Sequence, residues 1–473
     1  MERLFQLKRR NARVGTEVLG GVTTFVTMAY IIVVNPAILA AAGIPVGPST
    51  LATILTAAFG TILMGLLANR PIAVAPYMGE NAFIAFGLAA LGIGWQLRIG
   101  AVFVCGVIFV VITLLRIRGW LANSISPTLK HSFAVGVGFL LAFIGLNDTG
   151  IIKAYPVGKP PIAFFPPGSA ADLTTPVPAG GIPVPIEIGA LSQGPVLLAV
   201  GGVLLMTILI VLRVHGSLLI GIAATAAAGI ALGFGRAPEG IFALPHWSGP
   251  GGLGEIAGKL RFSETLADGR TISLFSMTLL PVLLTLFLMD FLDTLGTLVG
   301  VGAAGRMLDE RGDFPDIQKP MLVDATASVV SALLGTSTSG AYIESAAGIR
   351  EGARTGLAAV VTGLLFLACV FLVPLAVALT ELRFAYGPAL IVVGVTIMPV
   401  FRRMDLDDLT EFLPAFLTIV MMSLTFNPAN GVTAGLVVYP LLKVLTGRAK
   451  ELNAGMIVLG ALCALYYLFG LVH

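Results

Sequence analysis

The sequence predicts an all-α membrane protein that crosses the bilayer about 14 times. Of its 473 residues, 57% are hydrophobic and only 11% are charged, whereas soluble chains carry about 25% charged residues. Apolar runs of about 20 residues, the length of a membrane-spanning helix, follow one another along the chain. These runs are continuous and do not alternate apolar with polar residues, so the pattern excludes a transmembrane β-barrel.

Candidate spans divide into two sets of seven, each an apolar window bounded by charges, glycine or proline. The first set lies near residues 15–40, 49–68, 72–91, 98–116, 128–147, 193–212 and 215–234. The second set lies near residues 275–301, 319–335, 337–350, 354–380, 384–401, 409–426 and 429–446. A further apolar stretch, 455–472, is either a fifteenth span or a helix lying at the membrane interface.

Basic residues predict the orientation. Lys8, Arg9, Arg10 and Arg13 precede the first apolar run, which is too long for a signal peptide. The positive-inside rule puts this flank in the cytoplasm of a cell (plasma or inner) membrane. The long loops 148–192 and 235–272 then lie outside, and the first of them is rich in proline and should be extended.

The third span of each half is short and interrupted. Residues 71–83 contain two prolines, then Tyr77 and Glu80-Asn81, and residues 335–348 contain Thr, Ser and Gly, then Tyr342 and Glu344-Ser345. Interrupted segments at matching positions of two halves indicate a transporter with inverted repeats and a midplane site. Because each half has an odd number of spans, the repeats are expected to be inverted.

Few ionisable residues fall inside spans, where a central Asp costs about 2.5–3.5 kcal/mol on insertion scales. They are Glu80, Asp290, Asp293, Asp324 and Glu344. Asp290, Asp293, Thr294 and Thr297 form one stripe of the eighth span, and Thr23, Thr27 and Tyr30, with Thr24 beside them, form a similar stripe of the first.

Each polar group also has a structural interpretation. The Thr side chains could simply bond to their own helix backbones. Asp290 and Glu344 are expected to repel one another, so that one holds a proton and a proton relay follows. Asp293 and Asp324 fit structural partners of the broken backbone, while Glu80 could instead reach the interface.

Several functional classes gain no support. The four histidines and three cysteines have no ligand spacing, so we expect no metal site. No nucleotide-binding loop is present, so the proton is the only coupling agent expected and no cofactor is implied. The net charge of +3 does not indicate nucleic-acid binding. An intramembrane aspartyl protease is a competing interpretation of Asp290 and Asp293, although its second Asp motif is lacking. A passive channel is a further alternative.

Three motifs carry a resemblance to a known family. The sequences around Gly20–Pro36, Met289–Leu298 and Gly335–Gly348 resemble those of the AzgA-like purine permeases. These form a branch of the nucleobase:cation symporter-2 (nucleobase/ascorbate transporter) family, which carries adenine, guanine and hypoxanthine. The resemblance implies the uracil-permease fold, with 14 segments in two inverted repeats, short strands in segments 3 and 10, and gate-domain homodimers.

The resemblance also implies two domains. Spans 1–4 and 8–11, in residues 1–127 and 273–380, would form a core domain. Spans 5–7 and 12–14, in residues 128–234 and 381–473, would form a gate domain, and residues 235–272 an extracellular loop. Movement of one domain against the other would alternate access.

Site residues follow from the same resemblance and from chemistry. Asn81, Asp290, Asp293 and Glu344 match the polar positions of the family motifs, with Asp290, Asp293 and Glu344 assigned to proton coupling. The other candidates for contact with the base are Tyr77, Glu80, Thr24, Phe25, Phe83, Thr294 and Ser345. Tyr77 and Glu80 depart from the usual family pattern before Asn81, which leaves xanthine or uracil as alternative substrates.

Overall fold

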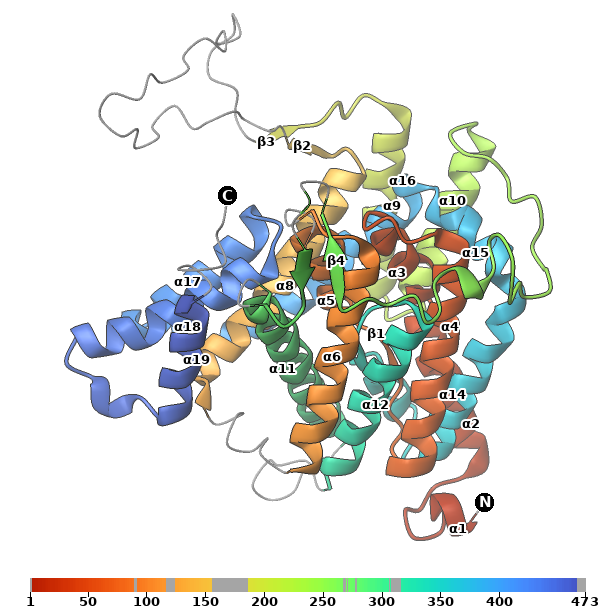
Figure 1. The fold of residues 1–473 in the computed structure, drawn as a ribbon. Coiled ribbons are helices and arrows are strands. Elements are labelled where there is room, and N and C mark those ends of the chain that lie inside the picture. Colours follow the sequence, from red (N-terminus) through yellow and green to blue (C-terminus); the bar gives the residue numbers. More distant parts are fainter. Residues whose placement is uncertain are drawn as a thin grey trace, which may run out of the picture.

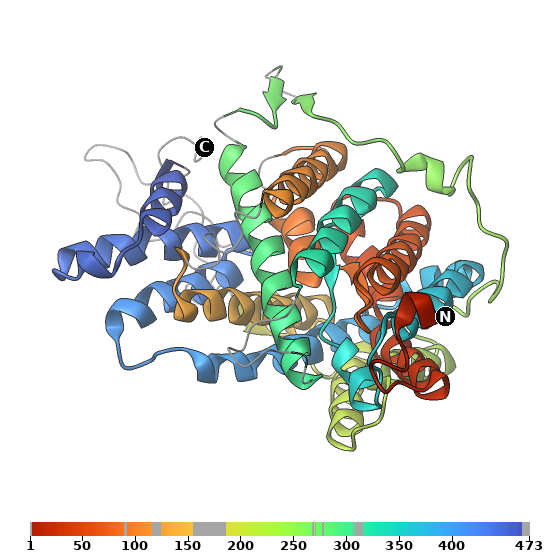
Figure 2. The same cartoon turned by 90° about the horizontal axis from the view of Figure 1, so that it is seen from below.

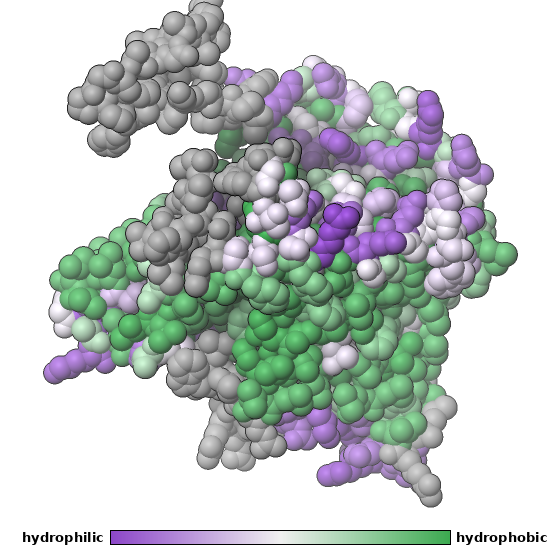
Figure 3. Space-filling model, viewed as in Figure 1, coloured by the Kyte–Doolittle hydropathy of each residue, from purple (hydrophilic) through white to green (hydrophobic). Residues whose placement is uncertain are grey.

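A computed structural model describes residues 2–88, 92–115, 124–154, 186–266, 269, 271–276, 279–305, 307 and 316–465. The described part of the chain is mostly helical, and the three sheets within it each have two strands (Figure 1). Within these described residues, nine helices are long and apolar enough to cross a membrane. On the face shown in Figure 3, hydrophobic side chains form a broad band, with hydrophilic surface above and below it. The fold is therefore that of a polytopic membrane protein, as the composition predicted.

The first half of the chain begins with the short helix α1 (Glu2–Phe5). Its remaining elements are α2 (Val14–Met28), α3 (Ile31–Ala40), α4 (Val46–Leu63), the π-helix η1 (Met64–Ala68), β1 (Val74–Pro76), α5 (Met78–Ala82), the π-helix η2 (Phe83–Gly87), α6 (Trp95–Leu114), α8 (Pro127–Asp148), β2 (Ile152–Ala154), β3 (Ile186–Ile188), α9 (Gly194–Val211) and α10 (Ser217–Ala231).

The second half follows the 3-10 helix η4 (Leu253–Glu255) and strands β4 (Ser263–Thr265) and β5 (Thr271–Ser273). Its elements are α11 (Leu280–Ala304), α12 (Gln318–Leu334), β6 (Ser339–Ala341), α13 (Ser345–Arg350), α14 (Gly356–Ala368), η5 (Cys369–Leu372), α15 (Val373–Thr380), α16 (Arg383–Ile397), η6 (Met398–Arg403), α17 (Leu409–Leu424), α18 (Pro428–Leu445), η7 (Ala449–Glu451) and α19 (Ala454–Leu465).

Two predicted spans differ from simple helices in the way that their sequences indicated. In the described part of the predicted span 72–91, strand β1 is followed by the short helix α5, and in the predicted span 337–350 strand β6 is followed by the short helix α13. The first predicted span, 15–40, is also broken, between α2 and α3. Tight hydrogen bonds bridge the break, from Ile32 N to Ala29 O (3.1 Å) and from Val33 N to Tyr30 O (3.1 Å).

The packing of the two halves repeats when one half is exchanged for the other. Helix α6 packs on α12 as α14 packs on α4, and α2 packs on α14 as α11 packs on α6. Likewise α8 packs on α17 as α16 packs on α9, and α9 packs on α10 as α17 packs on α18. Helix α11 contacts both α6 and α18 (Figures 1 and 2). The equivalent helix contacts indicate that the two halves of the chain form an internal structural repeat.

Strands β2 and β3 lie at the end of the molecule opposite the N-terminus: the strands are at the top in Figure 1 and the N-terminus is at the bottom. The prolines from which an extended first loop was predicted, Pro156 to Pro178, fall outside the described residues. The apolar stretch 455–472 begins as α19, which packs against α18, and continues beyond the described part.

Candidate functional site

Two short strands from opposite halves meet inside the helix bundle. Strands β1 and β6 are antiparallel, with Ala75 opposite Gly340. The pairing continues past both ends, since Tyr77 N donates to Thr338 O and Tyr342 N donates to Ala73 O, each at 2.9 Å. Extended backbone inside a membrane protein must be satisfied by protein partners. The two-stranded ribbon thus satisfies part of its own backbone and turns two spans into half helices.

Hydroxyl groups on neighbouring helices hold each strand in an equivalent way. Thr61 of α4 accepts from Val74 N and donates to Val74 O, each at 2.9 Å. Ser328 of α12 accepts from Ser339 N at 3.1 Å and donates to Ser339 O at 2.9 Å. The Ser345 hydroxyl accepts from Ala73 N at 3.0 Å. The ribbon is therefore fixed to the bundle on both sides.

Asp324 joins the ribbon to helix α11. One carboxylate oxygen accepts from Ala341 N at 2.8 Å, and the other accepts from the Thr294 hydroxyl. Both Asp324 and Thr294 are fully buried. Asp324 therefore positions backbone and side chain together.

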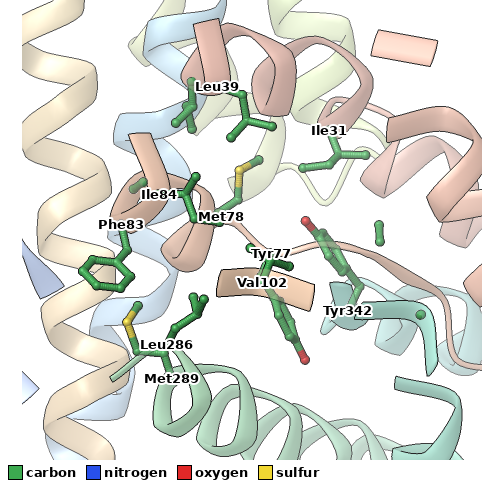
Figure 4. Packing of buried hydrophobic residues seen from close by; sticks show 14 of the residues in the cluster. Ile31, Leu39, Tyr77, Met78, Phe83, Ile84, Val102, Leu286, Met289 and Tyr342 are labelled. Carbon is green, nitrogen blue, oxygen red and sulfur yellow. The ribbon is translucent and has the colours of Figure 1, made fainter. Parts of the chain in front are cut away.

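Two tyrosine rings stack at the strand ends. The rings of Tyr77 and Tyr342 lie 6.2 Å apart between centroids with an interplanar angle of 9°, and their hydroxyls point in opposite directions (Figure 4). The Tyr77 hydroxyl bonds to that of Thr294 at 3.0 Å, and the Tyr342 hydroxyl donates to Pro76 O. A Cβ at Gly340 would lie 2.3 Å from the Tyr77 ring. Only glycine at position 340 leaves room for this ring.

Asn81 is held by a second buried amide. Its Nδ2 donates to Asn35 Oδ1 at 2.8 Å, and Asn35 Nδ2 donates to Thr53 at 2.7 Å and Thr336 at 3.0 Å. Both asparagines are fully buried. Since the Asn81 amide nitrogen is used in this way, its carbonyl oxygen is the atom left to accept a hydrogen bond.

Glu344 lies where β6 passes into α13. The Tyr30 hydroxyl donates to Glu344 Oε1 at 2.7 Å. Tyr30 is buried, while Glu344 is partly exposed. This bond links the break between α2 and α3 to the half helix of the opposite half.

The acids of α11 lie in different environments. Asp290 is buried and accepts a bond from the Ser328 hydroxyl at 3.3 Å. Asp293 is partly exposed. The hydroxyl of Ser328 thus touches both Asp290 and the strand β6.

The remaining candidates are dispersed. Thr24 lies against Gly348, where a Cβ would come within 2.2 Å of its hydroxyl. Phe25 packs edge-to-face on Phe366 of α14, with centroids 5.1 Å apart. Phe83 is fully buried and lies apart from the tyrosine rings (Figure 4). Glu80 is buried at 1% exposure, so it does not reach the interface in this structure.

Several buried oxygen atoms of the site have no hydrogen-bond partner among the described residues. They are Glu80 Oε2, Asn81 Oδ1, Asp290 Oδ1, Thr338 Oγ1 and Ser339 Oγ. Leaving such an atom unpaired costs about 1–3 kcal/mol. The first three are carboxyl or amide oxygens, so the site is suited to a ligand that presents N–H donors. In the described part of the chain, no cluster of three His, Cys, Asp or Glu side chains could hold a metal ion.

Sequence reasoning did not assign roles to Asn35, Ser328 and Tyr342. The signals were present, because Asn35 is a lone amide before Pro36 in an apolar run, and Ser328 follows Asp324 by one helical turn. Their partners lie far along the chain, so their roles required the tertiary structure.

A buried polar site built on two half-strands inside a repeated helix bundle defines a membrane transporter. The sequence model of the permease family matches residues 15–433. The chain belongs to this permease family, so the alternative of an intramembrane protease is excluded.

Relatives match along nearly the whole chain. A putative permease of Methanocaldococcus jannaschii, MJ0326, is 39% identical and aligns over 99% of this chain and 98% of its own length. The adenine permease AdeQ of Escherichia coli is 36% identical over 98% of this chain and 95% of its own. The guanine/hypoxanthine permease PbuG of Bacillus subtilis is 37% identical over 99% of this chain and 100% of its own.

Solved structures support the fold. The transmembrane domain of the cyanobacterial bicarbonate transporter BicA superposes with a TM-score of 0.59, covering 89% of this chain and 97% of that domain, at 18% sequence identity. At this identity the likeness concerns the fold alone.

Proposed function

We propose that this protein imports purine nucleobases, namely adenine, guanine and hypoxanthine, by proton symport. The observation that carries the proposal is the group of buried, unpartnered oxygens of Asn81, Glu80 and Asp290. It occurs in a chain whose full-length relatives include permeases named for adenine and for guanine/hypoxanthine.

Recognition of the base rests on donor and acceptor matching. A purine presents N–H donors and ring acceptors in one plane, and Asn81 Oδ1 and the Glu344 carboxylate would accept from the N–H groups. The stacked rings of Tyr77 and Tyr342 provide an aromatic surface at the strand ends. Thr294, which bonds to the Tyr77 hydroxyl, and Ser345, which accepts from Ala73 N, support this site from the neighbouring helices.

Proton coupling is assigned to Asp290, Asp293 and Glu344. Acidic groups inside a membrane repel one another when ionised. A proton bound by one of them removes this repulsion and so favours binding of the base. Asp290 is the buried member of α11 and carries the coupling proton in this proposal. Binding of the base to Glu344 and Asn81 would then be linked to protonation of Asp290.

The proposed topology has 14 segments in two inverted repeats and a cytoplasmic N-terminus. The repeated packing of the two halves and the antiparallel β1–β6 pair support the repeats. Residues 1–127 and 273–380 form the core, and residues 128–234 and 381–473 the gate. Elevator-like movement of the core against the gate would expose the site to each side in turn. By family resemblance two copies would pair through their gates, which light scattering of the purified protein would test.

Uptake of radiolabelled bases tests the substrate. Cells lacking their own purine uptake, expressing this protein, should accumulate adenine, guanine or hypoxanthine, and an uncoupler should abolish accumulation. Accumulation of xanthine or uracil alone would assign the alternative substrate. Accumulation of no base, or flux indifferent to the proton gradient, would overturn the symport proposal.

A further inference from the structure

The end of the molecule that carries the N-terminus contains a cationic cavity. The cavity has a volume of about 510 Å³ and is lined by four basic side chains, those of Arg9, Arg10, Arg70 and Lys319. Asp316 is the acidic side chain among the described residues that line it. The cavity therefore carries an excess of positive charge and is separate from the candidate transport site.

Hydrogen bonds fix the walls of this cavity. The Arg10 guanidinium donates to the carbonyl oxygens of Asn69, at 2.9 Å, and of Arg354, at 3.1 Å. Asn69 Nδ2 donates to Phe5 O at 3.1 Å, and Asn69 Oδ1 accepts from Gly356 N at 2.8 Å. Asn69 adopts a left-handed conformation, with φ of 49°, which asparagine tolerates better than most residues. The N-terminal segment is thus attached both to the end of η1 and to the beginning of α14.

The basic groups of the cavity oppose one another. Burial, and then the neighbouring charge of Arg9, lowers the pKa of Arg10, while Glu17 acts in the opposite direction. Burial, and then the charge of Arg10, lowers the pKa of Arg70, and Asp316 partly offsets this. Glu17 also accepts bonds from the backbone of Arg354 and Thr355. The carboxylates of Glu17 and Asp316 offset only part of the repulsion among the guanidinium groups. A bound anion would reduce it further.

Apolar side chains form the rim of the same cavity. Leu4, Leu66 and Leu67 are 58%, 48% and 46% exposed, and the two leucines of η1 end the candidate span Val46–Ala68. Hydrophilic surface lies below the hydrophobic band at this end of the molecule (Figure 3). A ligand that touches the whole cavity must therefore be charged at one end and apolar at the other.

We propose that this cavity binds the phosphate headgroup of an anionic phospholipid, with the acyl chains lying against Leu66 and Leu67. Guanidinium groups bind phosphate oxygens with paired hydrogen bonds. A phospholipid presents its phosphate at the depth where basic residues meet the last apolar turn of a span. The bound lipid would attach the N-terminal segment to the adjoining ends of the helices.

Thermal unfolding of the purified full-length protein in neutral detergent tests the site. Phosphatidylglycerol, with phosphatidylcholine as the neutral comparison, is titrated into the wild type, an Arg9→Gln/Lys319→Gln variant and an Arg402→Gln/Arg403→Gln variant. The last pair lines a second cavity near α17 and is the matched control. Arg9 and Lys319 are exposed, so both variants should unfold like the wild type in phosphatidylcholine. The Arg70→Gln variant, tested in the same way, provides an independent change.

Phosphatidylglycerol should raise the unfolding temperature of the wild type above the value in phosphatidylcholine. The Arg9/Lys319 variant should need about 25 times more phosphatidylglycerol for half of this shift, since each of the two basic groups near the surface contributes about fivefold. The Arg402/Arg403 control should change by less than about twofold on the same scale. Equal losses in both variants, or no loss in the first, would overturn the site. If soluble glycerol phosphate reproduced the shift and its dependence on Arg9 and Lys319, the ligand would be a free phosphate rather than a lipid.

Discussion

Replacing Asn35 by alanine tests how the site orients its amide. Asn35 is not itself among the proposed substrate-binding residues, but its Oδ1 accepts a hydrogen bond from Nδ2 of Asn81, which is, at 2.8 Å. Asn35→Ala removes that acceptor and leaves the buried Asn81 Nδ2 with only the weak acceptor Met78 Sδ, at 3.8 Å. The Asn81 side chain is then free to turn, and its carbonyl oxygen no longer has a fixed direction.

The expected size of the effect follows from this one buried donor, the Asn81 amide nitrogen. A buried donor without a partner costs about 1–3 kcal/mol, which corresponds to about a 5- to 150-fold change in an equilibrium constant. Thr53 keeps its bond to Ser49 O at 2.7 Å, so the other end of the network is only partly disturbed. Because the free and the purine-bound protein both carry this weakly paired donor, the cost lowers the stability of the protein by about 1–3 kcal/mol. The loss of a fixed direction for the Asn81 carbonyl oxygen should in addition raise the dissociation constant for the purine by about 10-fold.

Binding of radiolabelled purine to the purified protein provides the assay. Thr53→Val is the matched control, because it removes a bond of Asn35 but keeps the Asn35–Asn81 bond, and it should weaken binding by less than about threefold. If Asn35 acts through Asn81, the double variant Asn35→Ala/Asn81→Ala should bind no more weakly than Asn81→Ala. Additive losses in the double variant, or wild-type binding by Asn35→Ala, would refute the reasoning.

Three further changes address separate parts of the structure. Tyr30→Phe removes the hydroxyl that donates to Glu344 and should weaken purine binding by about tenfold. The control Tyr386→Phe removes the hydroxyl that donates to Asp148 and should leave purine binding unchanged. Equal effects of the two substitutions would contradict a role for Tyr30 in the site. Gly340→Ala places a Cβ 2.3 Å from the Tyr77 ring and should lower stability by about 1–3 kcal/mol in thermal unfolding, whereas Gly296→Ala has open space and should not. The ammonium group of Lys443 is fully buried and lies 2.7 Å from Glu451 Oε2 and 3.0 Å from Glu411 Oε1. Lys443→Met should destabilise the protein by about 2 kcal/mol, less than the loss of one partner from a fully buried ion pair, because these carboxylates reach water. The exposed Lys450→Met is the control, and equal unfolding temperatures of the two variants would contradict the prediction. Thr410 and Arg448 lower the pKa of Asp408, and Arg448 and Lys443 lower that of Glu451. The stability from these groups should therefore be complete above their ordinary pKa values near 4 and lost as the pH falls through the lowered values.

Local features of the sequence predicted the parts of the site that depend on local chemistry. The prolines and glycines of residues 71–83 and 335–348 forbid an uninterrupted helix, and those segments are strands followed by short helices. The helical spacing of Asp290 and Thr294 also follows directly from their positions. These features need no knowledge of what lies opposite.

The partners of these groups could not be predicted, because they come from distant segments. Glu344 is held by Tyr30 and Asn81 by Asn35, and nothing in either local sequence specifies the other. The same applies to the matching positions of Thr61 and Ser328, which become equivalent only when the two strands pair. Whether a polar or aromatic residue of a span contributes to the site also depends on the direction of its side chain in the bundle. The Phe25 ring, for example, packs on Phe366.

Proton movement driven by substrate tests the central claim most directly. Proteoliposomes containing the protein and an internal pH-sensitive dye should acidify when a transported purine is added outside. In Asp290→Asn proteoliposomes, exchange of labelled for unlabelled purine should continue while acidification and gradient-driven accumulation are lost. Purine uptake by the wild type without acidification, or undiminished acidification in Asp290→Asn, would contradict the account.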